Sequence, residues 1–208
     1  MLFRSLSFGD IGVQLNIPIV RSVLDLATRV EDIDDSMVEQ VLAPHSSGIR
    51  VLLSPYNRER GELVTAAHIG KALDILIAQY DYVVVDNHST YDERAIISLE
   101  RADLILVVVT PEIGPLMNTS YFIEIAEKLG LDLGKVQIVL NRSNSNVGIV
   151  GLEIERTLQQ RIDFRIQSGG TQVVQSVNQG TPIIQSQPNH PFSVQVAQMA
   201  EVLLKKLA

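Results

Sequence analysis

The sequence predicts an α/β protein built on a doubly wound, mainly parallel sheet flanked by helices. Short apolar runs rich in β-branched residues alternate along the chain with longer stretches of helical spacing. Three of these short runs contain almost no polar residue, which is typical of strands that are covered on both faces. Strand and helix in alternation favour right-handed crossovers and therefore a parallel sheet. The predicted strands span residues 49–54, 82–86, 104–110 and 136–141.

The stretches between the strands carry apolar residues at helical spacing. The clearest stretch runs from residue 63 to residue 80, where the apolar residues form one stripe. Two weaker helices are predicted at residues 20–28 and 36–42. They flank an acidic stretch at residues 30–35 that we expect to be a surface loop.

Capping residues mark the ends of the other helices. Thr90 and Glu93 have the spacing of a capping box, and Gly130 suits the C-cap of a helix over residues 115–129. Pro191 is a favourable first-turn residue for a final helix that extends to the end of the sequence. A further helix is marked by Val150, Ile154 and Leu158.

Composition and charge argue against several classes of protein. The length of 208 residues fits one domain, and the formal net charge of -7 argues against a broad basic surface for nucleic acid. The absence of cysteine excludes disulfides and thiolate metal sites and is compatible with a reducing compartment. No apolar run reaches the roughly 18–20 residues of a membrane-spanning helix, and the first residues lack the pattern of a secretory signal. We therefore expect a cytoplasmic protein.

The strongest candidate for a ligand-binding residue is Asp86. In an open parallel sheet, ligands bind outside the carboxyl ends of the strands. An apolar strand that ends in Asp is the Walker B pattern, in which the carboxylate holds Mg²⁺, usually through a water, beside the phosphates of a nucleotide. The alternative is that Asp86 only caps a turn or a helix. His88 lies two residues further on and is the one histidine that we single out.

Two further strand ends carry candidate residues. Asn141 and Arg142 follow the predicted strand at 136–141; an Asn side chain offers both a donor and an acceptor, which suits a purine edge. The alternative is an ordinary turn residue. Thr110 could face the ligand crevice, but Pro111 cannot continue a central strand, so strand termination explains this segment without a function.

A phosphate-binding loop of the form G-x-x-x-x-G-K-[ST] is absent from the sequence. Gly70-Lys71 and Gly134-Lys135 lack the rest of that motif. The segment at residues 168–171 is a loop that opens a helix, and it either binds an anion or serves as a cap. We assign no catalytic residue. Without the loop and its Lys, we expect this chain alone to bind ATP weakly or undetectably and to turn none over.

The order and spacing of five segments resemble the ParA/MinD superfamily of deviant Walker ATPases. Within that superfamily, the nearest similarity is to the CpaE-type proteins of pilus assembly and polar localisation. The similarity runs from about residue 6 to the end of the sequence. The segments that carry it are residues 8–17, 80–86, 102–112, 139–142 and 176–182.

This resemblance implies an ATPase that dimerises with ATP and is reset by slow hydrolysis. Asp86 would be the carboxylate on the Mg²⁺ side, and Asn141, with Arg142 beside it, would contact adenine. The implied cofactors of the intact parent are ATP and Mg²⁺. The implied partners are a second copy of the chain and the proteins of a localisation or pilus/secretion machinery. The last helix is better explained by packing on the sheet, so we expect no autonomous membrane anchor.

The sequence also departs from the pattern of that superfamily. The first strand, the phosphate loop and the first helix of the P-loop NTPase type are missing, and Phe3 and Ser5 stand where acidic residues are usual. We therefore expect residues 1–5 to be a non-native or unstructured start and residues 6–208 to be a single incomplete domain. After Asp86, the usual Pro-rich turn is replaced by Asn87-His88-Ser89-Thr90.

Two other classes of function stay open at this point. A non-enzymatic dimerisation or localisation scaffold with a degenerate nucleotide site fits the altered segment after Asp86. An unrelated doubly wound protein, such as a flavodoxin-like or dehydrogenase domain, is the third possibility. The absence of G-x-G-x-x-G disfavours its dehydrogenase form.

Overall fold

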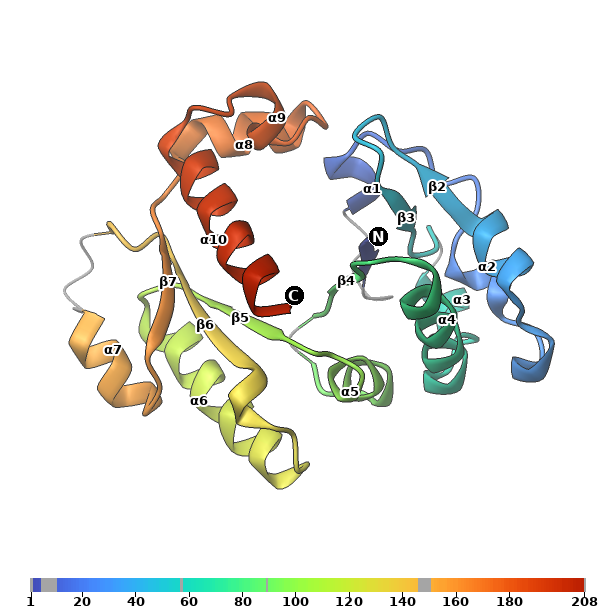
Figure 1. Ribbon diagram of the computed structural model, residues 1–208, viewed down its shortest axis with the longest axis horizontal. Helices are drawn as coiled ribbons and strands as arrows, with labels where there is room; N and C mark the ends of the chain where they lie inside the picture. The colour runs from blue at the N-terminus through green and yellow to red at the C-terminus, as the bar shows by residue number, and fades with distance from the viewer. Residues whose placement is uncertain (1, 5–10, 57, 89, 146–150, 208) are drawn as a thin grey trace. The chain divides into compact units, whose positions relative to one another are not determined.

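The computed structural model describes residues 2–4, 11–56, 58–88, 90–145 and 151–207, and it divides into two compact units. The N-terminal unit comprises Met1–Arg101 and Val177–Thr181, and the C-terminal unit comprises Ala102–Ser176 and Pro182–Ala208. Each unit contains one sheet with helices against it (Figure 1). The expectation that residues 6–208 form one incomplete domain stays a prediction.

The sheet of the N-terminal unit has four strands in the order β2-β3-β1-β4. The strand β1 is parallel to both of its neighbours, and its Arg4 lies opposite Asp86 of β4. The predicted strands at residues 49–54 and 82–86 are confirmed in a shorter form as β3 and β4. The strands are β1 Leu2–Arg4, β2 Leu42–Pro44, β3 Arg50–Leu52 and β4 Val84–Asp86.

Two features of this sheet differ from the sequence-based expectations. The strand β2 was not predicted, and it runs antiparallel to β3 across a turn in which Gly48 has φ +88°. An antiparallel edge strand still leaves the sheet mainly parallel. Leu2–Arg4 form a strand, so an unstructured start does not describe these three residues. The non-native origin of residues 1–5 stays a prediction.

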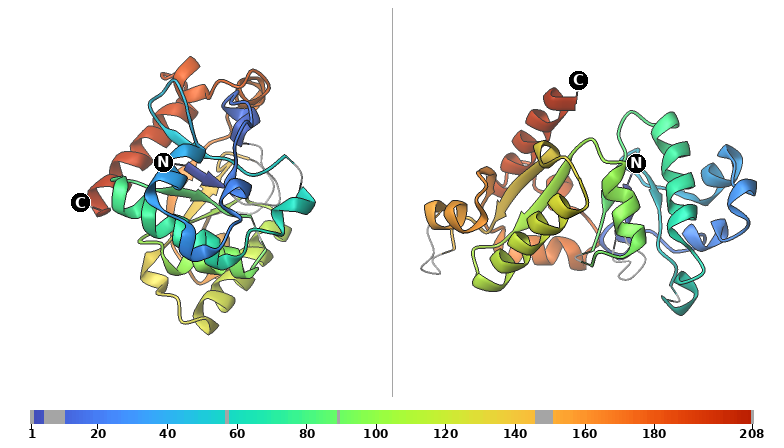
Figure 2. Two further views of the ribbon diagram at one scale, coloured as in Figure 1. Left: turned by 90° about the vertical axis from the view of Figure 1, so that its right-hand side faces the viewer. Right: turned by 90° about the horizontal axis from the view of Figure 1, so that it is seen from below.

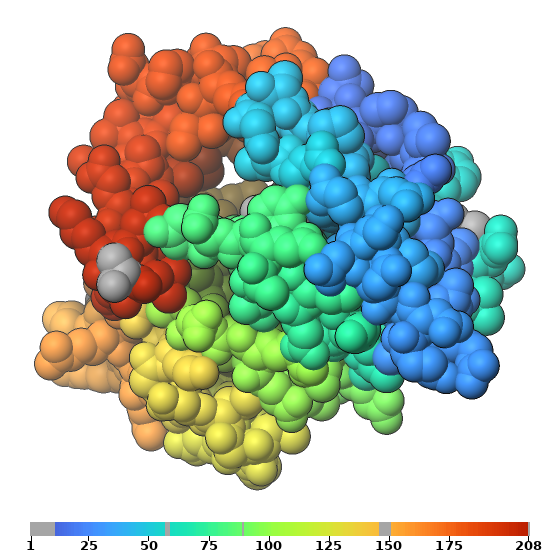
Figure 3. All heavy atoms as spheres, turned by 45° about the vertical axis from the view of Figure 1, so that its right-hand side comes forward, coloured from blue at the N-terminus to red at the C-terminus, as the bar shows by residue number. Residues whose placement is uncertain are grey.

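The helices of the N-terminal unit pack on a core of Leu, Ile and Val. The predicted helix at 63–80 is confirmed as α4, and its inward stripe includes Ile69, Leu73 and Leu76, all nearly inaccessible to solvent. Helices α2 and α4 pack side by side (Figure 3). The helical segments are α1 Ile11–Gln14, η1 Val23–Leu26, η2 Val30–Asp32, α2 Asp35–Val41, α3 Arg58–Gly61, α4 Ala66–Gln79 and α5 Glu93–Glu100.

The capping box that the sequence predicted at Thr90 and Glu93 is wrong. Helix α5 begins at Glu93, and its N-cap is Asp92, whose carboxylate accepts a hydrogen bond from the N–H of Ala95. A carboxylate at this position satisfies a free N–H of the first turn and favours the helix dipole, which explains why Asp92 replaces Thr90. Thr90 instead contacts His88.

The sheet of the C-terminal unit is entirely parallel, in the order β5-β6-β7. The predicted strands at 104–110 and 136–141 are confirmed as β5 Ile105–Val109 and β6 Val136–Asn141. The third strand, β7 Ile162–Ile166, was not predicted. Its apolar residues alternate with Asp163 and Arg165, which is a pattern of an edge strand rather than of a strand covered on both faces.

Helices cover both faces of this second sheet. Helix α6 packs on β5 on one face, with α7 against it, and α10 packs on β7 on the other face (Figure 2). This arrangement confirms the predicted parallel sheet flanked by helices. The helical segments are α6 Ile113–Lys128, η3 Leu133–Lys135, α7 Gly151–Leu158, α8 Gly170–Asn178, α9 Ile183–Ser186 and α10 Pro191–Leu207.

Both glycine-lysine pairs serve as ordinary structural elements. Gly70-Lys71 lies inside α4, where a side chain at Gly70 would stand 3.0 Å from the guanidinium of Arg101. Gly134-Lys135 lies in η3. Neither pair therefore forms a phosphate loop. Among the described ranges, no helix combines the length and the apolar character that crossing a membrane requires.

Candidate functional site

Asp86 is the last residue of β4 and lies at the carboxyl edge of the N-terminal sheet. The edge forms because β1, β3 and β4 are parallel and end on the same side. The Asp86 side chain is partly buried. Its position is the one expected of a carboxylate that faces a ligand crevice at a strand end.

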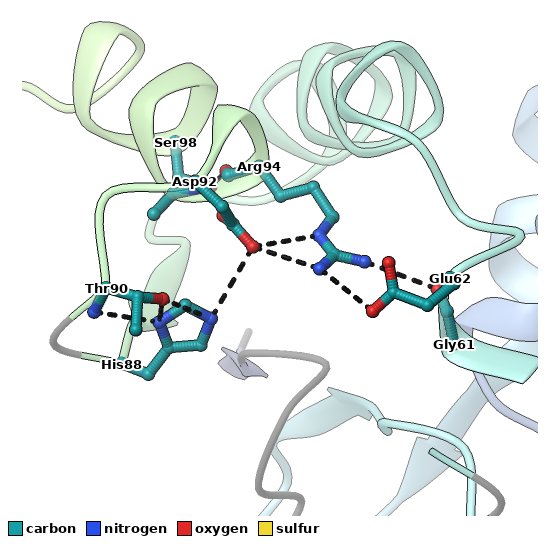
Figure 4. A network of polar contacts seen from close by, with 8 residues as sticks. Gly61, Glu62, His88, Thr90, Asp92, Arg94 and Ser98 are labelled. Carbon is teal, nitrogen blue, oxygen red and sulfur yellow. Dashed lines mark hydrogen bonds and ion pairs between the residues drawn. The ribbon is translucent and has the colours of Figure 1, made fainter. Parts of the chain in front are cut away.

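A network of polar contacts runs from His88, two residues after the end of β4, into the first turn of α5 (Figure 4). Nδ1 of His88 accepts a hydrogen bond from the backbone N–H of Thr90 at 3.1 Å, and the Thr90 hydroxyl also contacts this nitrogen. The other ring nitrogen, Nε2, lies 3.8 Å from a carboxylate oxygen of Asp92. The histidine ring therefore bridges the chain just after Asp86 and the cap of α5.

Asp92 uses both carboxylate oxygens. Oδ1 accepts a hydrogen bond from the N–H of Ala95 at 2.9 Å. Oδ2 accepts hydrogen bonds from Nε and Nη2 of Arg94 at 3.2 and 3.0 Å. Burial alone would raise the pKa of the Asp92 carboxyl. The Ala95 N–H, the Arg94 guanidinium and the nearby His88 outweigh it, so the pKa of Asp92 lies below its usual value.

Arg94 carries the network away from α5 to a distant part of the chain. Its Nη1 donates to the carbonyl oxygen of Gly61, and its Nη2 donates to a carboxylate oxygen of Glu62, both at 3.4 Å. Burial by itself would lower the pKa of Arg94, but Asp92 and Glu62 raise it by more. The net effect is a raised pKa, so the group stays charged. The guanidinium side chain is only 18% exposed. Sequence reasoning missed Arg94, Asp92 and Glu62, because no motif links the first turn of α5 to the connection between α3 and α4.

The number of acidic side chains near this edge bears on the kind of metal ion that it could bind. Among the described residues, no group of three or more His, Cys, Asp or Glu side chains could hold a metal by itself. Mg²⁺ in nucleotide sites needs only one or two carboxylates, since phosphates and waters complete its octahedral shell. The assignment of Asp86 to Mg²⁺ stays a prediction.

In the C-terminal unit, Asn141 is the last residue of β6. Its Oδ1 accepts the backbone N–H of Arg142 at 2.8 Å, and Arg142 has φ +51°. The turn continues to Asn144, whose Oδ1 accepts the N–H of Ser168 at 2.8 Å. The Asn141 oxygen thus takes part in the turn in this structure, and the choice between a turn residue and an adenine contact stays a prediction.

Pro111 predicts that the preceding strand ends before it. The structure agrees, because β5 stops at Val109 and α6 begins at Ile113. The residue between them that the sequence did not single out is Glu112. Its Oε2 is buried and has no hydrogen-bond partner among the described residues, which is rare for a carboxylate oxygen. This oxygen lies at the carboxyl edge of the C-terminal sheet.

The loop at residues 168–171 is a helix cap. The hydroxyl of Ser168 accepts the N–H of Gly170, and α8 begins at Gly170. This local bond favours the cap over the anion site as the explanation of the loop.

Asp86 and Asn141 each lie at the carboxyl end of a parallel strand, but they belong to different units. In the N-terminal unit, the structure brings together His88, Thr90, Asp92 and Arg94 in the segment that follows Asp86 in the chain. The expectation that Asp86 and Asn141 face one shared nucleotide stays a prediction.

No protein-family model matches the chain. Several solved structures, in contrast, have a similar fold. A ParA family ATPase from Chlorobium tepidum superposes with a TM-score of 0.88, at 22% sequence identity over 96% of this chain and 85% of that one. This chain has the fold of the ParA and MinD ATPases.

Two MinD structures share the same fold. MinD from Pyrococcus horikoshii, complexed with Mg-ADP, has a TM-score of 0.81 and 17% identity, over 100% of this chain and 85% of that one. MinD in the MinC:MinD cell division complex of Aquifex aeolicus has a TM-score of 0.78 and 19% identity, over 98% and 83%.

Two proteins from Methanocaldococcus jannaschii, both described as uncharacterized ATP-binding proteins, are similar in sequence. They are 22% and 20% identical over 203 and 180 residues, which is 95% and 86% of this chain. The match spans 73% of the first protein and 66% of the second.

Proposed function

We propose that this chain is the C-terminal portion of a switch ATPase of the ParA/MinD superfamily, which binds ATP with Mg²⁺ and dimerises in the ATP-bound state. The observation that carries the proposal is the fold match at a TM-score of 0.88, combined with a carboxylate, Asp86, at the end of β4. Similarity to two ATP-binding proteins supports the same ligand.

Within this proposal, each strand-end residue has one role. Asp86 holds Mg²⁺ through a water, since a partly buried carboxylate at a strand end suits that position. Asn141 contacts adenine, and Arg142 lies beside it. When bound, Mg²⁺ would neutralise charge on the phosphates. No residue of this chain is assigned to proton transfer.

We also propose that the nucleotide site is incomplete in this chain and needs a strand, a phosphate loop and a helix from a preceding segment. The support comes from β5, which is apolar throughout and, among the described strands, is hydrogen-bonded to β6 alone. Leu106 and Val108 of β5 are 39% and 63% exposed. Edge strands usually carry charges or Pro, as β7 does with Asp163 and Arg165. The composition of β5 is that of an interior strand.

The finer parts of the proposal come from the five sequence segments. We assign the parent to the CpaE-like branch, acting in the cytoplasm as a homodimer with proteins of a localisation or pilus/secretion machinery. Residues 1–5 would be a non-native start. Sequencing the locus upstream of the start tests this last point; an in-frame stop in genuine genomic sequence there would contradict it.

A second candidate function is a dimerisation or localisation scaffold that does not hydrolyse ATP. The observation that favours it is the polar network around His88 and Thr90, which occupies the segment where relatives of this type often carry a Pro-rich turn. A network tied into α5 restrains this segment against rearrangement around a phosphate.

Calorimetric titration with ATP and Mg²⁺ separates the two candidates. The chain alone should bind weakly or undetectably, whereas a version with an upstream strand, loop and helix restored should bind. Asp86→Asn in the restored version should weaken the Mg²⁺-dependent part of the affinity, and Lys128→Ala on the outer part of α6 is the control. No binding by either version supports the scaffold, and micromolar binding by the chain alone contradicts the proposed incompleteness.

A further inference from the structure

One guanidinium in the N-terminal unit joins two segments that are far apart in sequence. The first is the post-β4 loop, described at residues 87–88 and 90–92. The second is the α3–α4 connection, residues 61–65. Arg94 contacts Asp92 from the first segment, and both Gly61 and Glu62 from the second. Figure 4 shows the guanidinium between the two carboxylates.

Arg94 divides the donors of one guanidinium between the two segments. Nη2 is shared between Asp92 at 3.0 Å and Glu62 at 3.4 Å. A guanidinium donates in a fixed planar fork, so rotating it toward one carboxylate weakens the bond to the other. The side chain is 18% exposed, whereas Glu62 is 77% exposed. The bond to Asp92 is therefore the better shielded of the two.

The same loop is tied to Asp92 from its other end. His88 lies 3.8 Å from the Asp92 carboxylate and accepts the N–H of Thr90. Asp92 also caps α5 through Ala95. Movement of the loop therefore changes the environment of the Asp92 carboxylate and, through Arg94, that of the α3–α4 connection.

An ion pair between α5 and α4 provides a comparison, because it packs two helices together without involving a loop. Arg101 at the end of α5 donates to both oxygens of Asp74 on α4, at 2.7 and 3.2 Å. That pair joins two helices directly and contacts neither the post-β4 loop nor the α3–α4 connection. Its exposure, 28% for the Arg101 side chain, is comparable with that of Arg94.

We propose that Arg94 is a latch that couples the post-β4 loop to the α3–α4 connection, so that the two segments open together rather than independently. A ligand or partner that displaces the loop beyond Asp86 thereby frees Gly61 and Glu62. The coupling is a property of this chain's own contacts and does not depend on nucleotide binding.

Hydrogen–deuterium exchange on the full chain tests the latch. Arg94→Gln should raise the exchange rate about tenfold or more in peptides that cover both segments, with little change in the interior of α4. Arg101→Gln, the matched control, should leave both segments unchanged. Glu62→Gln removes a group from one segment only, and it should raise exchange in the post-β4 loop as well as in the α3–α4 connection.

Salt gives an independent readout of the same coupling. Between about 0.05 and 0.5 M NaCl, screening should speed exchange of both segments in the wild-type chain but not in Arg94→Gln. If Arg94→Gln fails to fold, Arg94→Lys keeps the charge with fewer donors and should show a smaller, parallel rise in both segments. The latch is overturned if Glu62→Gln affects only its own segment. It is also overturned if Arg94→Gln and Arg101→Gln act alike.

Discussion

Gly180 lies directly against Asn16. A Cβ at Gly180 would stand 2.7 Å from the Asn16 Cβ, 3.2 Å from its backbone nitrogen and 3.2 Å from the carbonyl oxygen of Val13. Both residues have a positive φ, +63° and +51°. The contact joins the segment after α8 to the segment after α1, two of the stretches on which the sequence resemblance depends, and both belong to the N-terminal unit.

Gly180→Ala should destabilise the protein more than an equivalent change at an open position. The positive φ costs about 1–2 kcal/mol for a residue with a Cβ, and the clash with Asn16 adds about 1–3 kcal/mol. Gly130→Ala is the control, because Gly130 has φ +73° but nothing within 4 Å of its Cβ position. Urea denaturation measures both; equal losses would show that the contact with Asn16 yields without strain.

His68→Phe should destabilise the start of α4 by about 1–3 kcal/mol, because the buried His68 side chain no longer donates to the carbonyl oxygen of Thr28. The His68 side chain accepts the N–H of Thr65 through Nδ1, so Nε2 carries the proton and donates to the carbonyl oxygen of Thr28 at 2.6 Å. His45→Phe in the β2–β3 turn is the control, since that ring bonds only within its own turn. Thermal unfolding should show a clear loss for the first variant and little for the second.

The stabilising effect of Asp92 should depend on pH. Its folded-state pKa lies below the usual value of 3.8, so its contribution is fully present above about pH 5 and is lost as the pH falls through the folded-state pKa. Asp92→Asn keeps an N-cap acceptor but removes the charge. The wild type should therefore exceed Asp92→Asn in unfolding free energy at pH 7, and the difference should shrink below pH 4.

Asp74→Asn is the matched control for this pH dependence. The hydrogen bond from Arg101 lowers the pKa of Asp74, against the opposing effect of burial. The contribution of Asp74 to stability should therefore also be lost as the pH falls. The Asp74 side chain is 57% exposed, which leads us to expect a smaller difference. A pH-independent gap between wild type and Asp92→Asn would mean that its charge contributes nothing to folding.

Val108→Lys should reduce self-association of this chain without unfolding it. Val108 is 63% exposed on an apolar strand with an open edge, and a Lys there discourages pairing with another chain. The unfolding free energy should change by less than about 0.5 kcal/mol. Val109→Lys is the contrasting variant, since Val109 is 1% exposed and a buried unpaired charge should prevent folding. Light scattering after size-exclusion chromatography measures the mass of each.

The strands that the sequence predicted correctly are those with continuous apolar runs. The strands β3, β4, β5 and β6 each contain such a run, which predicts a strand from the side chains of a few consecutive residues. Burial itself differs among them, since Val84 of β4 and Val108 of β5 are 55% and 63% exposed. The strand β7 escaped notice because Asp163 interrupts its apolar pattern. That carboxylate accepts the N–H of Ile138 where the β6–β7 register shifts, a role that a local sequence pattern does not reveal.

Some residues of the candidate site could be predicted from the sequence, and others could not. The placement of Asp86 and Asn141 at strand ends follows from two local facts: where an apolar run stops and which polar residue comes next. The polar network after Asp86 did not follow, because Glu62 of the α3–α4 connection and Arg94 of α5 are distant in the chain and meet only in the folded structure. The capping role of Asp92 was also assigned wrongly to Thr90, since several residues in that turn have the chemistry of a cap.

The sequence by itself determined the α/β alternation, the buried strands and the polar residues that end them, because these depend on the side chains of a few consecutive residues. Only the tertiary structure decided that Arg94 lies between Asp92 and Glu62, that Gly180 meets Asn16, and that Asp92 rather than Thr90 caps α5. The contacts of Arg94 with Glu62 and of Gly180 with Asn16 depend on the approach of segments that are distant in the chain, whereas the choice of Asp92 depends on where the backbone enters α5. Packing distance and backbone geometry select them, and no local pattern encodes either.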